Sequence, residues 1–72
     1  SPVYAIELAR LLADAGDLTS AAAKAERAVR TSPFDADYRE FAARTALLRK
    51  DYAEAERHIL ALTVLEPKRE VH

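Results

Sequence analysis

Two arginines that stand 34 residues apart, Arg10 and Arg44, are the side chains in this sequence best suited to bind an anionic ligand. A guanidinium group donates two parallel hydrogen bonds to a carboxylate, so two such groups on one surface would suit a carboxylate or an acidic peptide. Each arginine also follows a glutamate: Glu7 precedes Arg10 by three residues, and Glu40 precedes Arg44 by four. Side chains at these spacings meet along a helix, so an ion pair within the helix is the competing interpretation.

Histidine and cysteine add little further chemistry. The chain has no cysteine, and its two histidines cannot by themselves assemble a zinc site. Glu54 precedes His58 by one helical turn, and we expect these two residues to form a solvent-exposed pair on a helix. No GxSxG, phosphate-binding loop or HExxH motif occurs. The sequence therefore predicts a protein that is not an enzyme and that carries no metal or cofactor.

The composition predicts one small all-α domain. Glycine occurs once and proline three times among 72 residues, while the dominant Ala, Leu, Arg and Glu are strong helix formers. Eleven basic residues stand against twelve acidic ones, without the basic excess of a nucleic-acid-binding domain. No apolar run approaches the ~18 residues of a membrane span. The Ala and Arg content fits a GC-rich bacterial genome. The compartment stays open, with the cytoplasm favoured.

Turn and cap residues divide the chain into four helices. Gly16 is suited to end the first helix because glycine adopts the left-handed conformation without strain, and Asp17 is suited to cap the second. Pro33 ends the second helix, Asp35 caps the third and Asp51 caps the fourth. Short connections make each helix antiparallel to the next. We expect helices over residues 3–15, 18–31, 36–49 and 52–65.

The chain contains the same pattern twice, at a spacing of 34 residues. Identical residues at this spacing are Tyr4 and Tyr38, Ala9 and Ala43, Arg10 and Arg44, Asp17 and Asp51, Ala21 and Ala55, and Pro33 and Pro67. The period and the placement of the turn Asp, small Ala and final Pro resemble the tetratricopeptide repeat, a helix–turn–helix unit that stacks into a solenoid. Ala5 and Arg39 depart from this pattern where Trp is frequent, and Lys50 replaces the turn glycine.

The resemblance implies a right-handed α-solenoid of two helix–turn–helix hairpins. The single domain would span 1–72, with repeat one over about 2–35, repeat two over about 36–69 and the start of a further helix at 68–72. In this family the first helix of each unit lines a concave groove that binds a segment of another protein. By resemblance, the residues that face the groove are Val3, Ile6, Arg10, Ala13, Asp14, Asp37, Glu40, Arg44, Leu47 and Leu48.

The resemblance therefore implies a scaffold that binds a protein or peptide. The alternative is a structural spacer or oligomerisation module attached to another domain, such as an enzyme. A chaperone adaptor is disfavoured, because the chain has no Asn and Ile6, Arg10 and Phe41 do not reproduce the family's carboxylate clamp. A nucleic-acid-binding pentatricopeptide array would need a repeat one residue longer and a basic groove.

The outer face of the fourth helix would be left uncovered at the end of the array, which makes it a candidate surface for self-association. A solenoid needs a terminal helix with a polar outer face, and only five residues follow Pro67. We therefore expect either a fragment of a longer array, consistent with the missing initiator Met, or a homodimer formed through the fourth helix. The apolar residues expected at that contact are Ile59, Leu62 and Leu65.

Overall fold

The structure is a computed structural model that describes residues 2–66, in which four α-helices follow one another without a β-strand. These are α1 (Pro2–Asp14), α2 (Leu18–Thr31), α3 (Ala36–Leu48) and α4 (Tyr52–Leu65). They confirm the all-α class and lie within one residue of the expected bounds. The end of repeat two and the helix expected at 68–72 lie outside the described residues. Within residues 2–66, no helix has the length and apolar character needed to cross a membrane.

Three of the helices have an aspartate as N-cap, as the sequence predicts. Asp17 accepts a hydrogen bond from the backbone N–H of Ser20, and Asp51 accepts one from that of Glu54. Asp35 accepts from the N–H groups of the second and third residues after it. Each carboxylate satisfies donors that the first helical turn leaves without a partner, so the helix starts are set by local chemistry.

The turns inside the two hairpins have the same backbone hydrogen bonds at the 34-residue spacing. In the first turn the N–H of Asp17 bonds to the carbonyl of Leu12 at 2.8 Å, and in the second that of Asp51 bonds to Ala46 at 2.9 Å. Gly16 has φ 87° and Lys50 has φ 62° at the matching position. Lys50 thus adopts the left-handed conformation that glycine takes more easily. The sequence repeat is a repeat of backbone geometry.

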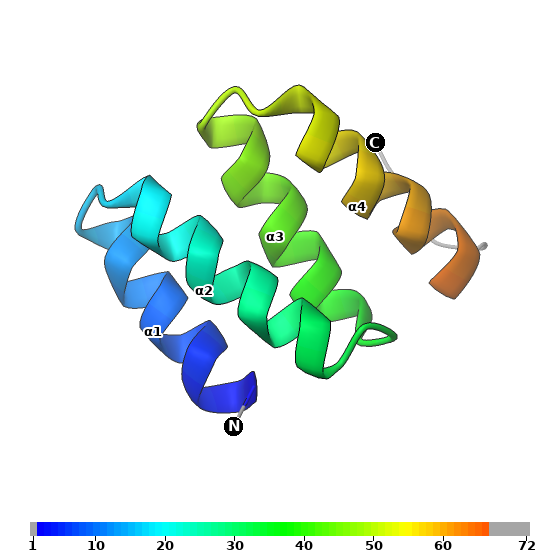
Figure 1. Cartoon of the computed structure of the whole chain (residues 1–72), viewed down its shortest axis with the longest axis horizontal. Coiled ribbons are helices and arrows are strands. Elements are labelled where there is room, and N and C mark those ends of the chain that lie inside the picture. Colours follow the sequence, from blue (N-terminus) through cyan, green and yellow to red (C-terminus); the bar gives the residue numbers. More distant parts are fainter. Residues whose placement is uncertain (1, 67–72) are drawn as a thin grey trace.

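Alanine allows the helices to pack closely. In Figure 1, α1 lies along α2, α3 lies along α4, and α2 packs on α3 to join the two hairpins. Small side chains at these contacts let helix axes approach to the short end of the ~8–10 Å range. The alanines that are no more than 1% exposed are Ala9, Ala21, Ala25, Ala28 and Ala55.

Two aromatic side chains of α3 cover the first hairpin. Tyr38 and Phe41 pack against buried residues of α1 and α2, among them Ile6 and Val29. Ile6 is only 3% exposed, so its expected place in the groove is wrong. It lies under the aromatic side chains that the next hairpin supplies, and this contact cannot be seen in α1 alone.

The expected self-association patch on α4 also needs correction. Leu62 is 7% exposed and matches Ala28 in the repeat, so it faces the inside of its own hairpin. Ile59 and Leu65 are partly exposed. Ile59, Leu62 and Leu65 therefore do not form one exposed surface. The large apolar side chains that α4 exposes are Tyr52, Leu60 and Val64.

Candidate functional site

A hollow of about 500 Å³ lies between α1 and α3. It is lined by Arg10, Ala13, Asp14, Asp37, Glu40, Phe41 and Arg44. All of these except Phe41 were expected to face a groove, so the structure brings most of the predicted set together. Val3, Leu47 and Leu48 are exposed but do not line the hollow. Phe41 was missed, although its place four residues after Asp37 and three before Arg44 puts it on the same helix face and could have indicated it.

Both arginines of the hollow are paired within their own helices. The guanidinium of Arg10 lies 2.7 Å from the carboxylate of Glu7, and that of Arg44 lies 2.6 Å from that of Glu40. Arg10 also lies over the ring of Phe41, 5.9 Å from its centroid, which is a cation–π contact between α1 and α3. The internal ion pairs that competed with a ligand-binding role are therefore present. Exposed pairs of this kind contribute at most about 1 kcal/mol.

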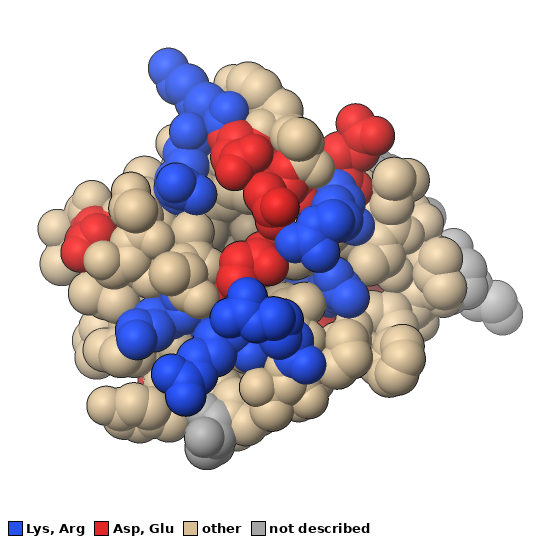
Figure 2. All heavy atoms as spheres, in the orientation of Figure 1, with Lys and Arg blue, Asp and Glu red and all other residues tan. Residues whose placement is uncertain are grey.

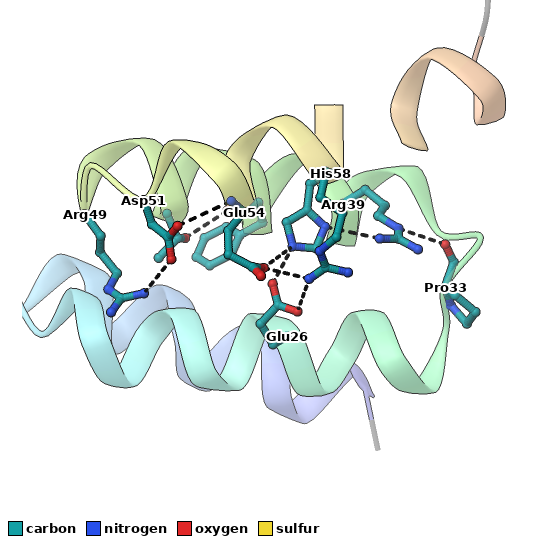
Figure 3. A network of polar contacts seen from close by, with 10 residues as sticks. Glu26, Pro33, Arg39, Arg49, Asp51, Glu54 and His58 are labelled. Carbon is teal, nitrogen blue, oxygen red and sulfur yellow. Dashed lines mark hydrogen bonds and ion pairs between the residues drawn. The ribbon is translucent and has the colours of Figure 1, made fainter. Parts of the chain in front are cut away.

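A polar network joins α2, α3 and α4 on another side of the molecule (Figure 3). His58 of α4 is fully buried, and its Nε2 contacts the carboxylate of Glu26 on α2. Its Nδ1 lies 3.2 Å from Nη1 of Arg39 on α3, and Nε of Arg39 donates to the carbonyl of Pro33 at 3.0 Å. The expectation of a solvent-exposed pair with Glu54 is therefore wrong. The ring points between three helices, and Glu54 lies 3.7 Å from its Nε2.

The neighbours of His58 determine its tautomer. Arginine has only donors, so Nδ1 must accept from Arg39, and a neutral ring then carries its hydrogen on Nε2 and donates to Glu26. Arg57 bridges the two carboxylates, with its Nη2 3.0 Å from Glu26 and 2.6 Å from Glu54. Within the described part of the chain, no buried side-chain nitrogen or oxygen lacks a hydrogen-bond partner. The network is internally complete.

Three residues of this network lie close enough together to be considered as a divalent-metal site. Ligand atoms of Glu26, Glu54 and His58 lie within 4.8 Å of one another, and carboxylate and imidazole are ordinary zinc ligands. A metal-bound imidazole normally donates its other N–H to an acceptor. Here Arg39 points a donor at that nitrogen, and Arg57 lies between the carboxylates. The donor arrangement fits a structural network and does not fit a metal centre.

A second hollow of about 540 Å³ lies between α2 and α4, on the face shown in Figure 2. Ala22, Ala23, Ala42 and Ala46 are among its lining residues, and Thr19 contributes a hydroxyl. Its lining contains three acidic residues and three basic ones. Asp51 pairs with Arg49 at 3.9 Å, and the other two acids belong to the polar network. The hollow therefore has no excess charge with which to select a charged partner.

The carboxyl group of Glu26 makes the network sensitive to acid. Burial raises its pKa, but the hydrogen bonds from His58 and Arg57 and the positive charge of Arg57 outweigh burial and hold the pKa below the ordinary value of 4.5. A depressed pKa in the folded state adds stability above the unfolded value, and this stability is lost as the pH falls through the folded value. We expect the thermal midpoint to fall more steeply below about pH 4.5 in the wild type than in Glu26→Gln.

Circular dichroism melts at a series of pH values measure this difference. Glu56→Gln is the matched control, because Glu56 is an exposed glutamate of α4 outside the network. Its melting curve should keep the acid dependence of the wild type. Parallel curves for the wild type and Glu26→Gln would show that the network does not shift the titration of Glu26.

Comparisons with known proteins supply no relative from which a function can be transferred. No protein-family model, curated protein or solved structure matches the chain. We therefore infer function from the two hollows and from the contacts that surround them.

Proposed function

We propose that this protein is a binding module of the tetratricopeptide-repeat type, a right-handed solenoid of two hairpins. Its groove between α1 and α3 would bind a segment of a partner protein. The observation that carries the proposal is the convergence of groove residues from both helices on one hollow. The identical hydrogen bonds of the two hairpin turns, centred on Gly16 and Lys50, support the repeat assignment.

The chemistry of the hollow suits a peptide better than a small molecule. Five of its seven lining residues are charged, whereas pockets for small molecules are mostly apolar with few polar groups. Phe41 supplies one partly buried aromatic surface among these charges. A peptide segment can combine an apolar contact on such a ring with several charge pairs around it.

A structural spacer or oligomerisation module is the second candidate. Tyr38 packs on the first hairpin, but its repeat counterpart Tyr4 is 70% exposed, and Leu11 is 67% exposed. On α4, Val64 is 79% exposed. These side chains offer apolar surface on α1 and α4, outside the groove, where a further helical unit would pack.

Charge reversal in the groove tests the leading proposal. Peptides selected from a random displayed library against the wild type should bind roughly tenfold or more weakly to a variant carrying Arg10→Glu and Arg44→Glu. The matched control carries Arg27→Glu and Arg30→Glu, which make the same charge change at exposed positions of α2 outside the groove. Fluorescence anisotropy gives the affinities, and circular dichroism confirms that both variants stay helical.

Amide chemical-shift changes in the labelled protein locate the contact. Under the proposal, they cluster on α1 and α3 around Phe41. Shifts confined to the hollow between α2 and α4, or equal affinities for the two variants, would contradict it. If no peptide is enriched and sedimentation shows association that grows with concentration, the spacer or oligomerisation candidate replaces it.

A further inference from the structure

The hollow between α1 and α3 carries uncompensated negative charge. Asp14 and Asp37 line it, and neither side chain takes part in an ion pair or hydrogen bond within the described residues. Its two arginines are already paired, one with Glu7 and one with Glu40. With Glu7 included, four acidic side chains stand against two basic ones around this hollow. The charge that remains available to a ligand is therefore negative.

Asp14 lies where its charge opposes the stability of its own helix. It is the last residue of α1, and the last turn of that helix contains no basic residue. Unpaired carbonyl groups give a helix C-terminus partial negative charge, so a carboxylate there is unfavourable. Asp37 lies in the first turn of α3, where its charge is favourable. Folding therefore accounts for Asp37 but gives no reason for Asp14.

The negative groove does not follow from the overall composition. The formal net charge of the chain is only −1. The basic residues without a partner among the described ones include Lys24, Arg27 and Arg30, which lie along α2. Figure 2 shows basic side chains gathered over α2. Unpaired basic charge thus lies along α2, whereas the groove between α1 and α3 holds the two unpaired aspartates.

We propose that the groove binds a basic segment, whose Lys or Arg side chains pair with Asp14 and Asp37. The aliphatic part of such a side chain can lie on Phe41 while its charged end reaches a carboxylate. This inference rests on the proposed function and names its class of partner. Of the two interpretations that the sequence left open for Arg10 and Arg44, it follows the internal ion pairs, because an acidic ligand would have to compete with Glu7 for Arg10.

Three short labelled peptides that differ only at their charged positions test the inference. These positions are lysine in one, glutamate in the second and glutamine in the third. Fluorescence anisotropy should give the tightest binding for the lysine peptide, weakening as salt is raised to ~0.5 M. Asp14→Asn should weaken binding of this peptide roughly fivefold or more. Glu56→Gln removes the same charge at an exposed position of α4 outside the hollow and should leave the affinity unchanged.

A melting curve separates binding from structure. Asp14→Asn should raise the thermal midpoint by a few degrees while it weakens binding, because the carboxylate opposes the helix dipole. A general loss of structure would instead lower both the thermal midpoint and the affinity for the peptide. Equal weakening by Asp14→Asn and Glu56→Gln overturns the inference, since the effect would then come from net charge alone.

The outcomes also separate the two proposals. Tighter binding of the glutamate peptide, lost on Arg10→Glu with Arg44→Glu, overturns the basic-segment inference and leaves the groove as the binding surface. Binding of none of the three peptides, together with failure of the displayed-library selection, overturns the proposed function itself.

Discussion

His58→Ala should destabilise the protein by about 3 kcal/mol. The substitution leaves a cavity at a fully buried position and removes the common partner of Glu26 and Arg39. A domain of this size has only about 3–5 kcal/mol of stability, so the variant should be largely unfolded at ambient temperature. Urea denaturation followed by circular dichroism measures the loss, with the midpoint near zero denaturant if the expectation holds.

Two further substitutions at this position distinguish pairing from filling of space. Glutamine can accept a hydrogen bond from Arg39 and donate one to Glu26, as the neutral imidazole does. Leucine fills the volume but leaves both partners without a bond. We expect stability to decrease in the order His58, glutamine, leucine, alanine. A leucine variant as stable as the wild type would show that the hydrogen bonds of His58 give no net stabilisation.

The helices could be predicted because local chemistry determines them. Asp17, Asp35 and Asp51 accept hydrogen bonds from the first turns of their helices, and these contacts span three residues or fewer. The alanines that recur at the 34-residue spacing are buried in both hairpins, where the helices pack closely. Ile6 was misassigned because its burial depends on Tyr38 and Phe41, which belong to the next hairpin.

The polar network could not be predicted from spacing within one helix. His58 lies 32 residues from Glu26 and 19 from Arg39, and the sequence showed only Glu54 one turn away. One indication was present: Arg39 occupies a position where the repeat pattern often has a large aromatic residue. A charged residue at such a position needs a buried partner, and His58 is that partner.

The groove illustrates a different limit. The resemblance to the repeat family predicted six of the seven residues that line the hollow, including Asp14 and Asp37. It did not decide which charges stay unpaired, because Arg10 and Arg44 could either bind a ligand or pair with the glutamates that precede them. In the structure Arg10 pairs with Glu7 and Arg44 with Glu40, which leaves Asp14 and Asp37 as the unpaired charges on which the basic-segment proposal rests.

Ala21→Leu and Ala55→Leu should each destabilise the protein by about 1–3 kcal/mol. Ala21 is 0% exposed and Ala55 is 1% exposed, so a larger side chain must push helices apart. Each kcal/mol lowers the thermal midpoint of a domain this small by roughly 4–8 °C. Ala23→Leu and Ala53→Leu are matched controls, because they make the same change at exposed positions of the same helices.

These controls should change stability by no more than about 0.5 kcal/mol. Leucine has helix propensity close to that of alanine, so the difference between buried and exposed sites reports packing alone. If Ala55→Leu and Ala53→Leu have the same thermal midpoint, the second hairpin tolerates a wider separation of α3 and α4 than its buried alanines indicate. The contacts of His58 with Glu26 and Arg39 would then not depend on a fixed distance between the helices. Close packing at Ala55 is thus a condition for the polar network.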